Sequence, residues 1–302
     1  MEVPVDDAAD RALPAAHDAA AARTRDVATG VYYDRLSRWT ARVSGLGYGG
    51  GRETLTAHRA LADPRASGRP TFTRLHDVLA DALPSPLRGH VLDAGCGLGG
   101  TMLDLAARGP ATFVGITLSA QQAAVARRAA AEAGLEARVD VRVGSYDEPP
   151  AGPFDAVIAI ESLAHSAQPG ATVAALAARL APGGRLVVVD DMPTVEARGT
   201  YALASFQAGW RLPVLLSAAE LAAAFERCGL VPAGDRDLTC EVRPRTLRRI
   251  AQLETLNRAL HRVLPSGGIR ELLDSYRGGL ALERLYRRGL MNYRLVVARK
   301  PG

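Results

Sequence analysis

Short apolar runs alternate with amphipathic segments through the middle of the chain, between about residues 90 and 190. Several runs, such as AVIAI and RLVVVD, are continuously apolar, which is typical of strands covered on both faces. Because strands that alternate with helices build a parallel sheet, this stretch predicts an α/β fold with a doubly wound, mostly parallel sheet. The expected strands are 90–94, 112–116, 139–143, 154–160 and 185–190, with helices over 101–108, 120–133 and 172–180.

The two ends of the chain have mainly helical patterns. Ser217 and Glu220 form a capping-box pattern, which predicts a helix that ends near residue 227. Residues 1–28 are expected to form a tail or weak helix. Further helices are expected over 31–43, 52–63, 71–83, 244–264 and 269–288. A poor strand over 230–238 and a last strand over 292–298 complete the expected elements. These elements predict a tail (1–28), an N-terminal helical lid (29–85), a core (86–199), a helical cap with the sixth strand (200–290) and a final core strand (291–302).

Composition predicts a soluble globular protein. Of the 302 residues, 48% are hydrophobic and 23% charged, and no run approaches the roughly 18 apolar residues of a membrane helix. The first residues carry no signal-peptide pattern, so we expect a cytoplasmic protein with no membrane partner. The net charge of +5 comes from arginines interleaved with acids, so we expect no nucleic-acid partner. Three cysteines without a CxxC pair argue against a disulfide framework and a zinc site.

The segment VLDAGCGLGG carries the clearest chemical signal. It follows an expected strand and opens a helix, where glycines allow a tight turn and the close approach of a ligand. Gly95, Gly97 and Gly100 match the GxGxxG pattern of dinucleotide sites, but such a site expects an acid about 20 residues further on, and GITLS stands there. Asp93 could instead accept hydrogen bonds from a cationic amino group, or cap its own loop.

VLDAGCGLGG also resembles the first motif of the class I S-adenosylmethionine (SAM)-dependent methyltransferases. GITLSAQQ, FDAVIAIESLAHS and LAPGGRLVVVDD match further motifs in order, so the resemblance covers about residues 88–192. The first helices and LERLYRRGLMNYRLVVARKP are similar to one branch, which holds sterol and geranyl-diphosphate C-methyltransferases, tocopherol-type enzymes and small-molecule O-methyltransferases of secondary metabolism. The resemblance implies a Rossmann-like sheet of seven strands, the last antiparallel, and SAM as the cofactor, with S-adenosyl-L-homocysteine (SAH) as its product.

The resemblance also implies where SAM binds. Most members place an acid at the end of the second strand for the ribose, and this chain lacks it. The usual aspartate for the adenine is also missing, unless Asp147 substitutes for it. The implied contacts are Asp93, Gly95, Cys96 and Gly97 for the methionine part, Leu118, Ser119 and Gln122 for the ribose, and Ser145 and Tyr146 for the adenine.

The loop ESLAH follows the fourth expected strand and should face the ligand crevice. In the branch that it resembles, Glu161 lies near SAM and His165 faces the acceptor. A histidine with an ordinary pKa near 6.5 suits a base that takes a hydroxyl proton, although His165 could also be a packed residue. With an alkene acceptor, methylation would leave a carbocation, which aromatic rings would stabilise and from which Glu161 would take a proton. The alternative is that Glu161 is a structural partner. The candidate rings are Tyr32, Tyr33, Trp39, Tyr201, Phe206 and Trp210.

Asp190 and Asp191 end the fifth expected strand. Two adjacent carboxylates without a histidine at ligand spacing are a weak metal signal, so we expect them to support His165 and expect no metal. The cap arginines are expected on a solvated helix face rather than against a diphosphate: Arg211, Arg243, Arg245, Arg248 and Arg249.

These observations predict a SAM-dependent methyltransferase that acts on a carbon or oxygen of a hydrophobic small molecule, a terpenoid or another secondary metabolite. The assembly stays open, and a homodimer is one possibility. One alternative is a protein that binds SAM without methyl transfer; another is an NAD-dependent oxidoreductase. A nucleic-acid methyltransferase would need an Asn/Asp-Pro-Pro-aromatic segment where this chain has IESL.

Overall fold

A seven-stranded sheet forms the centre of the computed structural model, which describes residues 24, 26–35, 54–65, 68–84, 87–264 and 268–302. The strand order is β3-β2-β1-β4-β5-β7-β6; β1 to β5 are parallel, and β7 runs antiparallel to both β5 and β6. The expected Rossmann-like sheet with a reversed last strand is therefore confirmed. The strands are β1 (His90–Ala94), β2 (Thr112–Thr117), β3 (Val139–Val143), β4 (Phe154–Ile160), β5 (Leu180–Pro193), β6 (Val231–Asp237) and β7 (Met291–Arg299).

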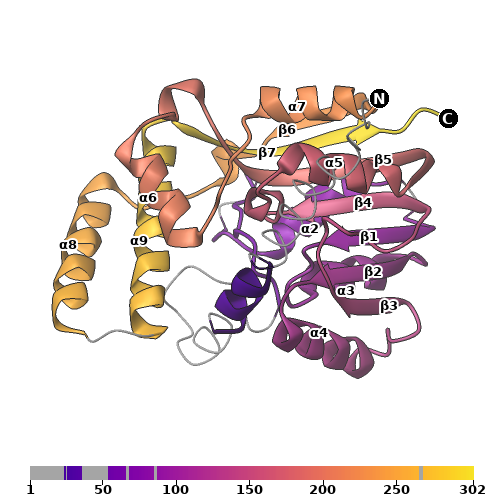
Figure 1. Cartoon of the computed structure of the whole chain (residues 1–302), viewed down its shortest axis with the longest axis horizontal. Coiled ribbons are helices and arrows are strands. Elements are labelled where there is room, and N and C mark those ends of the chain that lie inside the picture. Colours follow the sequence, from indigo (N-terminus) through magenta and orange to yellow (C-terminus); the bar gives the residue numbers. More distant parts are fainter. Residues whose placement is uncertain (1–23, 25, 36–53, 66–67, 85–86, 265–267) are drawn as a thin grey trace, which may run out of the picture.

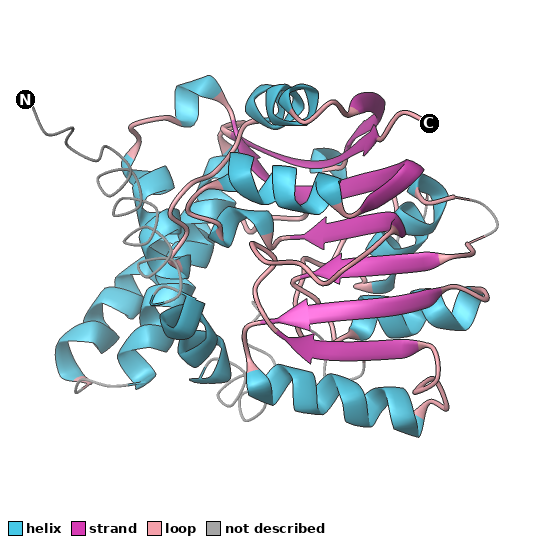
Figure 2. Ribbon diagram, turned by 45° about the vertical axis from the view of Figure 1, so that its right-hand side comes forward, coloured by secondary structure: helices cyan, strands magenta, loops and turns pink. Residues whose placement is uncertain are grey.

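Helices cover both faces of this sheet (Figures 1 and 2). On one face α2 (Thr73–Ala82), α3 (Gly100–Arg108) and α4 (Ala120–Glu132) pack against side chains such as Val91 and Phe113. On the other, α5 (Pro169–Ala178) and α7 (Ala218–Arg227) pack against residues such as Leu92. Neighbouring residues of one strand thus enter opposite cores, which explains the continuously apolar runs.

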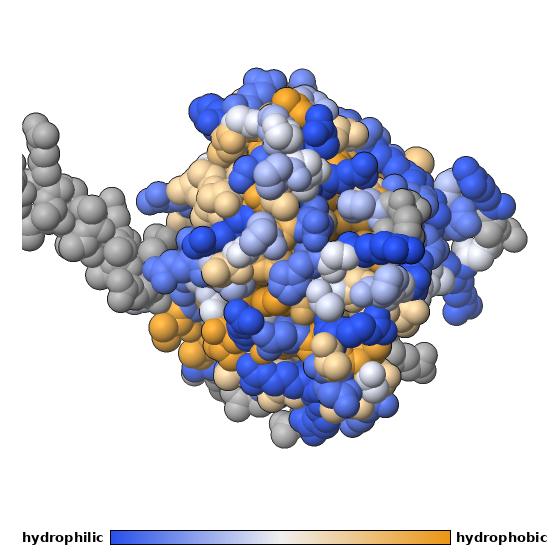
Figure 3. Space-filling view, turned by 90° about the vertical axis from the view of Figure 1, so that its right-hand side faces the viewer, coloured by the Kyte–Doolittle hydropathy of each residue, from blue (hydrophilic) through white to orange (hydrophobic). Residues whose placement is uncertain are grey.

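The helical cap stands beyond the carboxyl ends of the parallel strands (Figure 1). It consists of α6 (Tyr201–Trp210), α8 (Leu247–Val263) and α9 (Gly268–Arg287). Within residues 200–290, β6 is the edge strand of the sheet, as expected for the sixth strand, and α7 packs on the sheet because it buries Leu221 and Phe225 in its core. Residues 26–35 form a helix between the cap and the sheet (Figure 1). The opposite end of the sheet, which faces the viewer in Figure 3, is mainly hydrophilic.

One expected helix is wrong: residues 54–63 form turns and extended chain, with a bridge between Leu61 and Thr71. Their backbone groups bond to distant partners rather than along a helix. Leu55 O accepts from Gly100 N at 3.1 Å, and Arg59 N donates to Glu161 Oε1 at 2.9 Å. Those long-range bonds replace the i to i−4 ladder that the local pattern predicted. Short 3₁₀ turns complete the described elements: η1 (Leu163–His165), η2 (Val195–Ala197) and η3 (Thr239–Glu241).

Among the described residues, no helix is long and apolar enough to cross a membrane.

Candidate functional site

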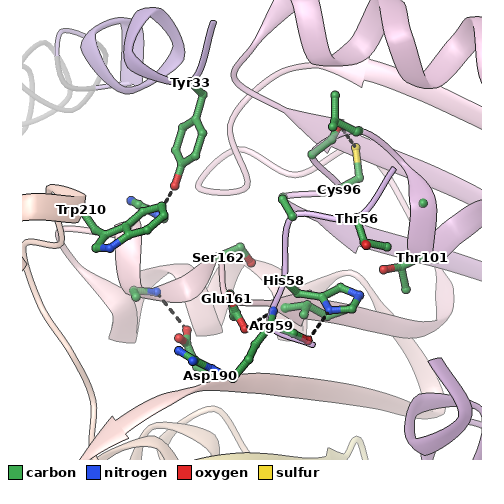
Figure 4. A pocket seen from close by; sticks show the side chains of 18 of the residues that line it. Tyr33, Thr56, His58, Arg59, Cys96, Thr101, Glu161, Ser162, Asp190 and Trp210 are labelled. Atoms are coloured by element: carbon green, nitrogen blue, oxygen red, sulfur yellow. Dashed lines mark hydrogen bonds between the residues drawn. The ribbon is translucent and has the colours of Figure 1, made fainter. Parts of the chain in front are cut away.

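A cavity of about 650 Å³ opens at the carboxyl ends of the parallel strands, which is where open α/β sheets bind ligands. Its walls come from the loops after β1, β2 and β4, from residues 54–60, from the helix over 26–35 and from the cap. Figure 4 shows Tyr33, Trp210, Glu161 and Cys96 around it. The cavity therefore joins segments from all parts of the described chain.

The glycine loop after β1 makes contacts that a side chain would block. Gly95 N and Cys96 N donate to Ile116 O at 3.0 and 2.9 Å, which ties the loop to β2. Gly95 has a φ of 98°, and a Cβ there would meet the Ser162 Cβ at 2.5 Å. At Gly100 a Cβ would lie 2.0 Å from a backbone oxygen of residue 54. Glycine is therefore required by backbone conformation at the first position and by close packing at the second.

Asp93 is the next-to-last residue of β1, just before this loop, and lines the cavity. Asp93 is 3% exposed, and within the described part of the chain no hydrogen-bond partner is found for its carboxyl group. Burial raises the pKa of Asp93 from 3.8 to about 7. A buried carboxylate without a partner is costly, so this position fits a ligand that brings a cation, such as the amino group of SAM.

The expected ribose contacts Leu118, Ser119 and Gln122 all line the cavity. Ser119 caps α4, because its Oγ accepts from Gln122 N at 3.0 Å. Thr117 Oγ1 donates to Gln122 Oε1 at 2.9 Å. The strand end thus holds its own polar side chains in place before a ligand enters.

Of the residues expected to contact the adenine, only Tyr146 lines the cavity. Tyr146 lines it and donates to Ser162 O at 2.9 Å, but Ser145 does not, because its Oγ turns to Asp147 N at 3.2 Å. The Asp147 carboxylate accepts a hydrogen bond from Thr172 and does not line the cavity either. Asp147 is therefore no substitute for the missing adenine aspartate.

His165 lies on the cavity wall, in the short turn after β4. Burial lowers its pKa from 6.5 to about 4, so the expected ordinary pKa is wrong and the imidazole is neutral at pH 7. The Tyr33 hydroxyl lies 2.5 Å from His165 Nε2, and their rings meet edge to face at 5.3 Å. Burial raises the pKa of Tyr33 well above 10, so the phenol keeps its proton and donates it to Nε2 when the imidazole carries its own proton on Nδ1.

Glu161 belongs to a buried charged cluster that the sequence does not reveal. Its Oε1 accepts from Arg59 N at 2.9 Å and from the Tyr293 hydroxyl at 2.8 Å. Arg59 pairs with Asp191 at 3.2 Å and lies over the rings of Tyr286 and Tyr293. Burial and Asp191 raise the pKa of Glu161, against the charge of Arg59. The signal for Tyr286 and Tyr293 was the C-terminal motif; Arg59 stood in an expected helix with no motif around it.

Asp190 supports the His165 turn through the backbone rather than the ring. Its Oδ2 accepts from Ala164 N at 3.2 Å, and its Oδ1 accepts from Asp191 N at 2.9 Å. Burial, and then the charges of Asp191 and Glu161, raise the pKa of Asp190 well above its usual value. No group of three metal-ligating side chains is found in the described ranges.

The aromatic candidates separate into three groups. Tyr33, Phe206 and Trp210 line the cavity. Tyr32 and Tyr201 need correction: Tyr32 is buried against α9, with its hydroxyl 2.7 Å from Ser275 Oγ, and Tyr201 is 82% exposed because it opens the outer turn of α6. Trp39 lies outside the described residues. Further wall residues that the sequence did not single out are Thr56, His58, Phe72, Leu212, Val242 and Leu282.

Comparison with known proteins identifies the class. A family model described as a methyltransferase domain matches residues 91–184, the stretch that contains the glycine loop and β4. Solved structures of similar fold hold SAM or SAH. The matched domain, the curated relatives and the fold neighbours that hold SAM or SAH support a SAM-dependent methyltransferase with SAM as its cofactor.

Individual relatives carry different activities in their names. The chain is 28% identical to the 27-O-demethylrifamycin SV methyltransferase of Amycolatopsis mediterranei, over 81% of this chain and 89% of that protein. Two further curated relatives match over only 59% and 56% of their own lengths. By structure, the chain is similar to a geranyl diphosphate methyltransferase in complex with GPP and sinefungin, with a TM-score of 0.67 and 23% identity over 92% of this chain and 99% of that one. It is also similar to the cyclase SpnF, with a TM-score of 0.68 and 23% identity over 90% and 94%.

Proposed function

We propose that this protein transfers the methyl group of SAM to a hydroxyl oxygen of a hydrophobic small molecule, a terpenoid or another secondary metabolite. One observation carries the choice of oxygen: a buried, neutral imidazole nitrogen faces the cavity and holds a hydroxyl group at 2.5 Å. An acceptor hydroxyl can replace that of Tyr33 at the same nitrogen. The apolar walls, with Phe206, Trp210 and Leu212, suit a hydrophobic acceptor.

When bound, SAM supplies an electrophilic methyl group on a positively charged sulfur. Asp93 would hold its amino group, and the glycine loop would admit its methionine part. SAM would supply the methyl group to the acceptor oxygen and leave as SAH, while His165 Nε2 would accept the proton that this oxygen loses. The proton then resides on a buried imidazole of low pKa, which releases it readily.

Glu161 has a different role in this proposal. Arg59 N and the Tyr293 hydroxyl both donate to its Oε1, so the carboxyl group anchors residues 54–60 against β7. We therefore treat Glu161 as a positioning residue. Transfer to carbon, with Glu161 as the final base, is the competing reaction.

The test is a methyl-transfer assay with labelled SAM and a panel of hydroxylated terpenoid, polyketide and phenolic acceptors, each beside its O-methylated counterpart as a blocked control. We expect label only with free hydroxyls. His165→Ala should lower kcat by about 10²- to 10⁴-fold while the Kd of SAH changes little. Tyr33→Phe should retain turnover, because the acceptor displaces that hydroxyl.

Two results would overturn the proposal. A product that keeps its hydroxyl and gains a carbon-bound methyl group would assign the reaction to carbon. Micromolar SAH binding without any methylated product would favour a protein that binds SAM for another purpose. The cytoplasmic location and a homodimer stay predictions from the sequence.

A further inference from the structure

The ribose part of the cofactor site lacks the carboxylate that dinucleotide and methyltransferase sites usually place at the end of the second strand. The chain has Leu118 and Ser119 there. The structure brings a carboxylate to this place from a distant segment: Ser119 Oγ donates a hydrogen bond to Asp34 Oδ1, and Gln121 N points to the same oxygen at 3.4 Å. Asp34 belongs to the helix over residues 26–35.

The donors and acceptors at the end of β2 explain how the Asp34 carboxylate could assist ribose binding. Ribose hydroxyls are donors as well as acceptors, so the site needs acceptors that face the cavity. Gln122 Oε1 accepts from Thr117, and Ser119 Oγ accepts from Gln122 N. Because the Ser119 hydroxyl donates its hydrogen bond to Asp34, a second lone pair of Ser119 Oγ can accept from a ligand hydroxyl at the cavity wall.

The helix that carries Asp34 is held against the strand end on one side and against the cap on the other. A Cβ at Gly30 would lie 2.6 Å from Leu118 O, so a glycine lets the helix lie directly on this turn. On the cap side, the Tyr32 hydroxyl meets Ser275 at 2.7 Å and Arg35 pairs with Glu271 at 3.1 Å. Tyr33, between these residues, reaches His165.

We propose that Asp34 supplies the carboxylate of the ribose subsite from the N-terminal helix, acting through Ser119 as a positioning residue. The ribose hydroxyls and this helix then stabilise each other's binding. The inference rests on SAM as the cofactor and does not depend on whether oxygen or carbon is methylated.

The experiment compares two ligands by calorimetric titration: SAH, and SAH without its 2′ and 3′ hydroxyls. The wild-type protein should prefer SAH. Asp34→Ala should weaken SAH binding by about tenfold, because Ser119 Oγ loses the charged partner that orients it, and leave the dideoxy ligand nearly unaffected. Asp34→Asn, which keeps an acceptor oxygen, should lie between the two. Arg35→Gln removes the cap contact of the same helix and is the matched control; it should change both affinities equally.

A double-mutant cycle tests the path through Ser119. In a Ser119→Ala background, Asp34→Ala should cost little further SAH affinity, since the two side chains act as one unit. Equal weakening of both ligands by Asp34→Ala, or no change, would overturn the ribose role. Wild-type protein that fails to bind SAH would instead contradict the cofactor itself, so the two failures are distinguishable.

Discussion

The buried Asp93 carboxyl group should make cofactor affinity depend on pH in the neutral range. Without a ligand, burial holds its pKa at about 7, whereas an exposed aspartate titrates near 3.8. Only the ionised form attracts the cationic amino group of SAM or SAH. The apparent Kd should therefore rise as the pH falls through 7, and lowering the pH from 8 to 6 should weaken SAH binding by about tenfold, or about 1.4 kcal/mol.

Ionisation of Asp93 strengthens SAH binding but lowers the stability of the unliganded protein. The folded-state pKa of Asp93 is raised, so its contribution to stability is present at low pH and is lost as the pH rises through 7. Between pH 6 and 8 this loss is about 1.4 kcal/mol. Asp93→Asn removes the titration, and should stabilise the unliganded protein more at pH 8 than at pH 6.

Calorimetry at pH 6, 7 and 8, in buffers of different ionisation enthalpy, measures both the SAH affinity and the protons released. At pH 6 we expect about 0.9 proton released per SAH bound, and at pH 8 about 0.1. The pKa values of His58 and His165 lie at about 4, outside this range. Asp93→Asn should bind SAH weakly and without this pH dependence. A wild-type affinity that is flat from pH 6 to 8, or a dependence that survives in Asp93→Asn, would refute the reasoning.

Three further predictions concern packing, a buried ion pair and metals. Gly100→Ala should lower the free energy of unfolding by about 1–3 kcal/mol, because the new Cβ meets Thr54 O at 2.0 Å; Gly68→Ala, where the Cβ meets nothing within 4 Å, is its control in chemical denaturation. Glu241→Gln should cost about 2 kcal/mol in the same assay, since Glu241 is buried and pairs with Arg74 at 2.9 Å; an unchanged midpoint would contradict this. Treatment with EDTA should leave methyl transfer unchanged, because Asp190 already accepts from Ala164 N and Asp191 pairs with Arg59; activity restored by added Mg²⁺ would show otherwise.

The sequence alone determined most of the sheet and the cofactor class. Strands β1, β3 and β4 begin and end where the apolar runs predicted, and the capping box opens α7 as expected. These features depend on residues a few positions apart, so a local pattern contains the information needed. The glycine loop is similarly local, because its conformation and its ligand approach both require small residues within one turn.

Only the tertiary structure decided which side chains share the cavity. Tyr33 meets His165 across 132 residues of chain, and Asp34 meets Ser119 across 85. Residues 54–63 do not form the predicted helix, because their backbone groups make hydrogen bonds with Gly100 and Glu161, which are far along the chain. The pKa of Asp93 also depends on burial by several segments at once. Such contacts arise from the packing of whole elements, and no periodicity or motif in the chain records which distant residue will occupy a given position.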